Sequence, residues 1–353
     1  MTSIAALLRF AVQQKASDLH VSAGEPPMLR VHGDMFRVDG PALSSEDAHR
    51  MIFDIMNDGQ RRTFQDKLEC DFAFALDDTL RFRVNVFVQN RGEGAVFRSI
   101  PSKIPRFDEL GLPQVVRHLC EEEKGLVLVT GPTGSGKSTT LAAMIDHLNE
   151  TMAGHILTLE DPIEFVHKPK RSMVNQREVG TQTHTFSSAL RSALREDPDV
   201  ILVGELRDLE TTALALTAAE TGHLVFATVH TSSAPKTIDR IVDVFPPAQQ
   251  AQVRAMLSES LLGVITQMLL HKVGGGRVAA LEILIGTAAV RNLIRESKTH
   301  QIPSAMQVGG KVGMQTMEAA VLQLVNRGLV TLDEVRNRMP DTAAALERQA
   351  VAS

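Results

Sequence analysis

The stretch Gly131-Pro132-Thr133-Gly134-Ser135-Gly136-Lys137-Ser138 decides the fold of this 353-residue chain. It is a complete G-x-x-x-x-G-K-[S/T] loop, with the apolar run Gly125–Thr130 before it and a predicted helix, Thr139–Asn149, after it. Glycines let a backbone wrap phosphates, so that N–H groups and the helix N-terminus face the anion. We expect Lys137 to reach the β- and γ-phosphates of ATP and Ser138 to ligate Mg²⁺ directly, with Thr139 beside it.

Further apolar runs follow the loop and alternate with helical segments. Continuous apolar strands separated by helices predict a parallel sheet covered on both faces, here an α/β P-loop ATPase domain. The runs are His155–Leu159, Val200–Val203 and Leu224–Val229. Beyond Ser233 the pattern is mainly helical, with one strand-like piece at Val278–Leu284.

The first hundred residues differ in pattern and predict an α+β module. A helix over residues 1–17 precedes four strand-like runs, of which the last two read as a hairpin around Asp77-Asp78-Thr79. The runs are Asp18–Ser22, Met28–His32, Cys70–Leu76 and Leu80–Gln89. A proline-bracketed stretch after them predicts a linker. The expected organisation is a first domain over residues 1–99, a linker over 100–106, and an ATPase domain over 107–353, of which 233–353 is mainly helical.

Carboxylates follow two of the apolar runs. Glu205 comes after Val200–Val203, and Gly204 stands where the second motif of P-loop ATPases usually has Asp, so Glu205 is the candidate to orient and polarise the attacking water. Glu160 and Glu164 end the run before it and could hold the water shell of Mg²⁺ or the attacking water. The plain alternatives are a surface glutamate and a solvated acidic loop.

His230 follows the run Leu224–Val229 and would lie at the same sheet edge, where a histidine can donate to a γ-phosphate. Arg81, Arg83 and Arg98 lie in the first module and could neutralise transition-state charge at a neighbouring subunit's site. A satisfied structural histidine and a polar sheet face meeting water are the alternatives. The basic stretch at residues 167–171 reads as solvated surface.

Composition excludes several classes of partner. The net charge of −5 and the absence of Trp and Tyr argue against a nucleic-acid enzyme, which needs a basic groove and usually aromatic platforms. No apolar stretch approaches the roughly 20 residues of a membrane span, so we expect no direct membrane insertion. The two cysteines, Cys70 and Cys120, are read as buried reduced thiols, as in a cytoplasmic protein.

Together these motifs resemble the secretion and pilus motor ATPases, and most closely the type IV pilus retraction ATPases of the PilT family. The likeness covers nearly the whole chain. Gly131–Ser138 matches the Walker A box, Glu160–Glu164 the aspartate box, Gly204–Asp208 the atypical Walker B box, His223–His230 the histidine box, and Ala16–His20 the entry to the N-terminal domain. Ala289–Glu296 resembles the retraction signature, with Val290 where Ile is usual.

The resemblance implies a PAS-like N-terminal domain joined to a RecA-like ATPase domain. It also implies a homohexamer in the cytoplasm, recruited to the inner-membrane base of the pilus by a platform protein, with a paralogous retraction ATPase as a further partner. By match to the family motifs, Lys137 and Ser138 carry over as nucleotide and Mg²⁺ contacts, and Glu205 and His230 as catalytic-site residues. Arg81, Arg83 and Arg98 carry over as inter-subunit arginines.

Three other functions remain open from the residues alone. They are an accessory retraction paralogue, a pilus-extension or type II secretion ATPase, and a RecA-like nucleic-acid-dependent ATPase. The extension and secretion ATPases usually carry a four-cysteine zinc insertion, which two cysteines cannot supply.

The signature segment Ala289–Glu296 reads as an amphipathic helix. Val290, Leu293 and Ile294 form its apolar stripe, and two arginines, Arg291 and Arg295, lie four residues apart on the other side. Like charges at that spacing destabilise a helix slightly, so we expect an acidic partner from elsewhere in a ring. The alternative is an ordinary helix with a solvated basic face.

Overall fold

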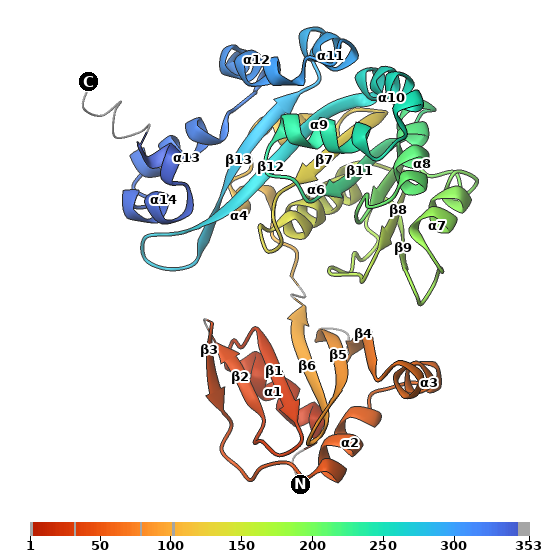
Figure 1. The fold of residues 1–353 in the computed structure, drawn as a ribbon, viewed down its shortest axis with the longest axis vertical. Coiled ribbons are helices and arrows are strands. Elements are labelled where there is room, and N and C mark those ends of the chain that lie inside the picture. Colours follow the sequence, from red (N-terminus) through yellow and green to blue (C-terminus); the bar gives the residue numbers. More distant parts are fainter. Residues whose placement is uncertain (1–2, 32, 78–79, 101–102, 345–353) are drawn as a thin grey trace. The chain divides into compact units, whose positions relative to one another are not determined.

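A computed structural model describes residues 3–31, 33–77, 80–100 and 103–344. The chain divides into two compact units, Met1–Lys103 with Pro162–Val166, and Ile104–Asp161 with His167–Ser353 (Figure 1). The division between residues 103 and 104 falls inside the linker predicted over 100–106, of which residues 101–102 lie outside the described part. The grouping of Pro162–Val166 with the first unit was not expected from the sequence.

The first unit is an antiparallel sheet with three helices, so the expected α+β N-terminal domain is confirmed. Its strand order is β3-β2-β1-β6-β5-β4. The elements are α1 (Ile4–Gln13), β1 (Asp18–Ser22), β2 (Met28–Val31), β3 (Asp34–Arg37), α2 (Ser45–Phe53), α3 (Asp58–Lys67), β4 (Glu69–Ala75), β5 (Arg81–Gln89) and β6 (Gly92–Ile100).

Strand β5 explains why this sheet has one apolar face. Phe82, Val84 and Val86 alternate along it and are buried, and they pack with residues of β1, β6 and α1. Strands β3 and β6 were not predicted from the sequence. Strand β6 begins Gly92-Glu93-Gly94, which looks like a turn, but it pairs along its length with both β1 and β5. In the predicted hairpin turn, residues 78–79 lie outside the described part of the chain.

The second unit is built on a seven-stranded sheet of order β13-β12-β7-β11-β10-β8-β9. Its strands are β7 (Gly125–Thr130), β8 (His155–Glu160), β9 (Met173–Glu178), β10 (Val200–Val203), β11 (Leu224–Val229), β12 (Leu261–His271) and β13 (Arg277–Ile285). Six strands are parallel, and β13 runs antiparallel to β12. The expected RecA-like α/β domain is therefore confirmed, with a mixed rather than wholly parallel sheet.

The helices of this unit surround the sheet. They are α4 (Phe107–Leu110), α5 (Gln114–Cys120), α6 (Lys137–Thr151), α7 (Phe186–Ala193), α8 (Leu209–Glu220), α9 (Ala234–Asp243), α10 (Pro247–Ser260), α11 (Ala288–Arg295), α12 (Ile302–Val308), α13 (Met317–Asn326) and α14 (Leu332–Arg338), with short 3₁₀ turns at Thr299–Gln301 and Gly309–Val312.

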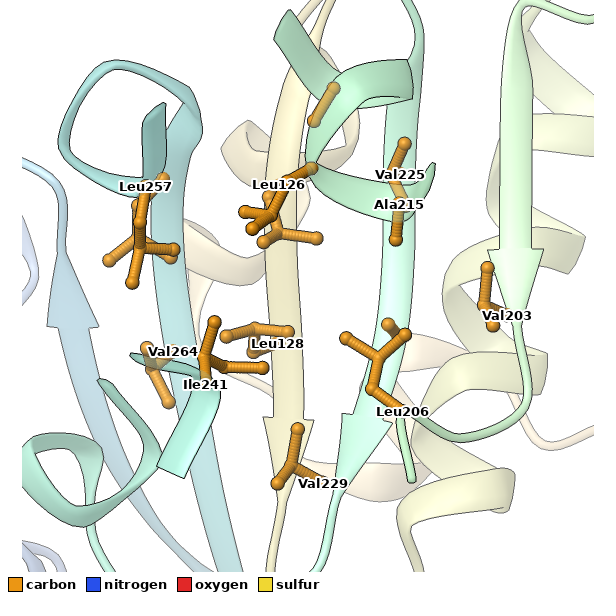
Figure 2. Packing of buried hydrophobic residues seen from close by; sticks show 14 of the residues in the cluster. Leu126, Leu128, Val203, Leu206, Ala215, Val225, Val229, Ile241, Leu257 and Val264 are labelled. Atoms are coloured by element: carbon orange, nitrogen blue, oxygen red, sulfur yellow. The ribbon is translucent and has the colours of Figure 1, made fainter. Parts of the chain in front are cut away.

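The central strand β7 is buried on both faces, and its alternate residues join two different cores. Leu126 and Leu128 pack with residues of α8, α9 and α10, whereas Val127 and Val129 pack with residues of α5 and α6. Figure 2 shows the first core, with Leu128 beside Ile241 of α9 and Leu126 further along the same strand. Each fully buried side chain of this kind contributes roughly 1.5–3 kcal/mol, so the strand that carries the loop is firmly held.

One expectation for the second unit is wrong. The segment after Ser233 was predicted to contain one strand, but its described residues, up to position 344, contain two, because Leu261–His271 forms an eleven-residue strand parallel to β7. An apolar run without alternation does not distinguish a doubly buried strand from a buried helix. Leu261–His271 pairs with β7 on one side and with β13 on the other, which identifies the segment as a strand.

Candidate active site

The phosphate-binding loop leaves the carboxyl end of β7 and runs directly into α6. A Cβ atom at Gly131 would lie 2.4 Å from the backbone oxygen of Gln267 and 2.6 Å from the Oγ atom of Ser135, so only glycine fits there. Helix α6 begins at Lys137, which puts Ser138 and Thr139 in its first turn. Pro132, Thr133 and Gly134 are exposed, whereas Ser135 is buried. The loop thus offers an open edge and the positive end of a helix to an anion.

Lys137 is buried and its ammonium lies over this loop. The Nζ atom donates to the carbonyl oxygens of Gly131 and Pro132, at 2.9 and 3.1 Å. It also lies 3.5 Å from Nδ1 of His230. The structure therefore brings together the two residues that the sequence placed at the end of β7 and at the end of β11.

His230 connects Lys137 with Glu205. Its Nε2 atom lies 3.4 Å from Oε2 of Glu205, a carboxylate whose residue is only 9% exposed. An ammonium can only donate, so Nδ1 is the atom that can accept from Lys137, while Nε2 faces Glu205. The result is a polar chain from the phosphate-binding lysine to the candidate catalytic carboxylate.

Arg207 completes this chain and was not singled out from the sequence. Its Nε atom lies 2.6 Å from Oε2 of Glu205, while its side chain is 72% exposed. Glu205 is thus held between an exposed arginine and His230.

Gly204, in the position where Asp is usual, is explained by its neighbours. A Cβ atom there would lie 3.1 Å from the backbone oxygen of Leu159 and 3.4 Å from Cα of Glu160. The Gly204 N–H donates to that same Leu159 oxygen at 2.7 Å, and the hydroxyl of Thr228 donates to the Gly204 carbonyl. Strands β8, β10 and β11 are therefore drawn together at the level of the candidate site.

The two acidic candidates of the aspartate box fall in different units. Glu160 ends β8, and its Oε1 atom accepts from the hydroxyl of Thr158 at 2.6 Å and from Nε2 of Gln176 at 3.1 Å. Glu164 belongs to Pro162–Val166, which groups with the first unit. Glu160 is thus a preoriented acceptor at the sheet edge, and the part of Glu164 at a metal stays a prediction.

The three arginines all lie on the sheet of the first unit. Arg98 of β6 is bound to the buried carboxylate of Asp18, with Nε 2.9 Å from Oδ1. Arg83 of β5 lies directly opposite Arg98 in the register, and both are exposed. Arg81 is half-buried, and its Nε atom has no hydrogen-bond partner within the described chain. Arg83 and Arg98 thus lie side by side on the sheet, and the carboxylate of Asp18 already balances the charge of Arg98.

His223 and the basic stretch at residues 167–171 both make contacts within the ATPase unit. His223 lies at the start of β11, at the opposite end from His230, and its Nδ1 atom is 3.0 Å from the carbonyl oxygen of Ala218 in α8. His167 is buried, so the interpretation of residues 167–171 as solvated surface is wrong for this residue. Burial lowers the pKa of its imidazole to about 4. Lys170 pairs with Asp146 and Glu150.

Gln267 on β12 is a second site residue, after Arg207, that was not predicted from the sequence. It is 1% exposed. Its Nε2 atom donates to the Ser135 carbonyl at 2.6 Å, and its Oε1 atom accepts from the hydroxyl of Thr140 at 2.8 Å. Gln267 therefore braces the loop against the first turns of α6. In the sequence, this role could have been suspected because Gln267 is a single amide side chain inside the apolar run Leu261–Leu270.

The loop suits a nucleotide and its metal ion. The buried Oγ atom of Ser135 has no hydrogen-bond partner in the described protein, so a bound phosphate would satisfy it. Within the described residues, no group of three or more His, Cys, Asp or Glu forms a metal cluster.

A phosphate cradle between a strand and a helix, at the edge of a mostly parallel sheet, defines a RecA-like P-loop ATPase. A family model described as type II/IV secretion system protein matches residues 1–275. The type IV pilus retraction ATPase PilT of Pseudomonas aeruginosa is 61% identical over 335 residues, 95% of this chain and 97% of that protein. A twitching motility protein of Neisseria gonorrhoeae is 56% identical over 338 residues, 95% of this chain and 90% of that protein.

A solved structure agrees with these relatives. The crystal structure of the pilus retraction motor PilT with bound ADP matches with a TM-score of 0.90 at 50% identity, covering 97% of this chain and 98% of that one. This chain belongs to the type II/IV secretion system protein family and, within it, to the PilT family of pilus retraction ATPases. Over the described residues, no helix is both long and apolar enough to cross a membrane.

Proposed function

We propose that this chain hydrolyses ATP as a subunit of a homohexamer and uses the energy to retract type IV pili, the action behind twitching motility. The observation that carries the proposal is the polar chain Lys137–His230–Glu205, which links a complete phosphate-binding loop to a carboxylate at the same sheet edge. The names of the relatives, a retraction ATPase and a twitching motility protein, support pilus retraction as the work done.

The loop residues Gly131, Pro132, Thr133, Gly134, Ser135 and Gly136 would wrap the phosphates with their backbone N–H groups, where a residue has one. Lys137 would turn its ammonium from the loop carbonyls toward the β- and γ-phosphates. Ser138 would ligate Mg²⁺ directly, next to Thr139, while Glu160 and Glu164 would reach the ion through water. Bound Mg²⁺ supplies neutralisation of the phosphate charge that builds up during transfer.

Glu205 would orient and polarise the attacking water from its position between Arg207 and His230. His230 would exchange its contact with Lys137 for one with the γ-phosphate, which makes the ring sensitive to whether that phosphate is present. Strand ends β8, β10 and β11 carry these groups on one rigid edge, so little reorganisation is needed during the reaction.

Arg81, Arg83 and Arg98 would act on the site of a neighbouring subunit. The position of Arg83 and Arg98 supports this, because the two residues lie opposite each other on neighbouring strands and are exposed, so an anionic partner could reach both guanidinium groups. Mixing wild type with increasing amounts of a Lys137→Ala variant tests shared sites. The specific activity should fall more steeply than the fraction of wild-type subunits, and a linear fall would contradict the sharing.

The expected place of action is the cytoplasmic base of the pilus at the inner membrane. A membrane platform protein would receive the force, and a paralogous retraction ATPase would assist. Deleting the gene and counting surface pili separates this role from the alternatives: more pili without movement means retraction, and no pili means extension. If the chain were an accessory paralogue, deletion of its gene would weaken retraction but not abolish it. DNA-stimulated turnover with steep salt dependence would instead indicate a nucleic-acid enzyme.

The decisive experiment for the site is Lys137→Ala. We expect the loss of steady-state phosphate release at saturating Mg-ATP, because this ammonium is the cation placed at the β- and γ-phosphates. Lys124→Ala is the matched control, since Lys124 is exposed and immediately precedes β7 at the end opposite the loop. If Lys137→Ala retained activity within about threefold of wild type, a difference of under 1 kcal/mol, the site assignment would be wrong.

A further inference from the structure

A cavity of about 390 Å³ lies directly beside the phosphate-binding loop. Three of the residues that line it, Pro132, His230 and Gln267, belong to the candidate active site. The Nζ atom of Lys137, the cation expected at the β- and γ-phosphates, lies 3.1 Å from the Pro132 carbonyl oxygen and 3.5 Å from Nδ1 of His230. The cavity therefore borders the position that the γ-phosphate would take in the proposed reaction.

The segment that joins β11 to α9 supplies a second wall of the cavity, with Thr231, Ser232 and Lys236. Lys236 is exposed and lies in the first turn of α9, where its Nζ atom is 3.4 Å from the Oγ atom of Ser232. The hydroxyl of Thr231 lies 2.7 Å from that of Thr237, which is fully buried, so this wall is tied to the helix. One cavity thus adjoins both the phosphate-binding loop and an exposed lysine.

The charge around this cavity favours an anion. Among the described residues that line it, Lys236 carries a permanent positive charge and none is Asp or Glu. Over the residues that the structure describes, Lys236 forms no ion pair, and its ammonium contacts a neutral hydroxyl. Glu205 contacts His230 but does not line the cavity. A cation without a carboxylate partner attracts a mobile anion more strongly than a paired one does.

Orthophosphate is the anion that the proposed reaction would set free beside this cavity. Hydrolysis forms a bond between the water oxygen and the γ-phosphorus and breaks the bond from that phosphorus to the bridging oxygen. ADP, orthophosphate and one proton are the products. A cavity of about 390 Å³ has room for this ion with several water molecules, because each water takes about 30 Å³.

We propose that this cavity is the exit site of orthophosphate, and that Lys236 is the cation that draws the ion away from the active site. The inference rests on the ATP hydrolysis proposed above. The ion first lies against Lys137 and His230, and it passes through the cavity to Lys236 while ADP is still bound. The hydroxyls of Thr231 and Ser232 donate to it there. Lys236 is not needed to break the bond, but it sets the rate at which the product leaves.

The test follows a single turnover of full-length Lys236→Met beside wild type. Acid quenching measures the formation of orthophosphate, and a fluorescent phosphate sensor measures its release. We expect formation within about twofold of wild type and a release time about three- to tenfold longer, equivalent to about 0.7–1.4 kcal/mol. Lys236→Arg keeps the cation and should match wild type. Arg240→Met is the matched control, because Arg240 is an exposed cation one turn further along α9 that does not line the cavity.

Inhibition of steady-state turnover by added orthophosphate is a second measurement, which a merely structural residue would not alter selectively. Lys236→Met should raise the inhibition constant of orthophosphate about three- to tenfold, while the dissociation constant of ATP stays within about twofold. Ser232→Phe tests the route without removing a charge. Ser232 is exposed and lines the cavity, so a bulky ring there should obstruct it and delay release while formation continues.

Two results would overturn the proposal. The first is an inhibition constant of orthophosphate that Lys236→Met leaves within about twofold of wild type, because the ion would then bind only at the loop. The second is an equal slowing of formation and release, which would place Lys236 in the bond-breaking step. Failure of the underlying reaction would look different, since wild type itself would then form no orthophosphate in the quenched samples.

Discussion

Gln267 offers the sharpest test of how the phosphate-binding loop is held. Its amide bridges the Ser135 carbonyl and the Thr140 hydroxyl from a position that is 1% exposed. In Gln267→Met, a side chain of similar length fills the space but makes neither hydrogen bond. Each buried group left without a partner costs about 1–3 kcal/mol. The Thr140 hydroxyl can turn to a carbonyl of its own helix, so the net loss is about 2–4 kcal/mol.

This free-energy cost should weaken nucleotide binding, because the phosphate-binding loop must keep its curved conformation for its N–H groups to face the phosphates. A cost of about 2–4 kcal/mol raises the dissociation constant for ATP about 30- to 1,000-fold. Thr140→Val removes one of the two bonds and should raise it by about 5- to 30-fold, whereas Thr140→Ser keeps the hydroxyl and should match wild type. Equilibrium binding of a fluorescent ATP analogue measures these constants, and the melting temperature without nucleotide shows how much of the loss is general destabilisation.

The double variant Gln267→Met with Thr140→Val tests whether the two single substitutions break the same hydrogen bond or act independently. Because the two side chains contact each other, we expect the combined effect to differ from the sum by 0.5 kcal/mol or more. The reasoning is refuted if Gln267→Met binds ATP within about threefold of wild type, or if the entire loss is already present in the melting temperature.

Three further outcomes are expected. Glu205→Gln should bind ATP almost normally but turn over about 100-fold more slowly, since an amide cannot polarise water as a carboxylate does; normal phosphate release would remove Glu205 from the chemistry. Arg291→Ala or Leu293→Ala should keep hexamers and most ATPase activity but stop retraction, as judged by turnover and twitching of the same strains; equal losses of both would mean that α11 only packs. His167 stays neutral when folded, with a pKa of about 4, but takes up a proton near pH 6.5 when unfolded, so stability is lost as the pH falls through this window. Between pH 7 and pH 5 wild type should lose about 2 kcal/mol more than His167→Gln in urea denaturation, and equal losses would refute the buried neutral ring.

The structure changes one part of the reasoning about the signature helix. Arg295 was expected to need an acidic partner from elsewhere in a ring, but Glu259 of α10 in the same chain lies 2.8 Å away. Arg291 donates through Nε to the carbonyl of Gly286, immediately after β13. The helix is therefore anchored at both arginines within the subunit, while Val290 and Ile294 are buried in the core as its apolar stripe predicted.

The sequence by itself determined the phosphate-binding loop and the strands that lead to it. Gly131–Ser138 is specific because its residues are consecutive, and the conformation it needs depends on glycine and on the helix that follows. Four apolar runs became β7, β8, β10 and β11, since a strand buried on both faces must be apolar at every position. Glu205 and His230 could be placed beside the loop because the carboxyl ends of parallel strands share one edge.

Only the tertiary structure decided which distant residues support that edge. Strand β12 was missed because its partner β7 lies far away in sequence, as the contact between Thr130 and Thr266 shows. The role of Gln267 follows from that pairing, and this polar residue belongs to no local motif. The roles of Arg207 and Glu259 likewise became clear only from their contacts in the structure, with Glu205 and with Arg295. A contact between residues more than a hundred positions apart leaves no spacing to read, because its geometry is set by how the strands pack.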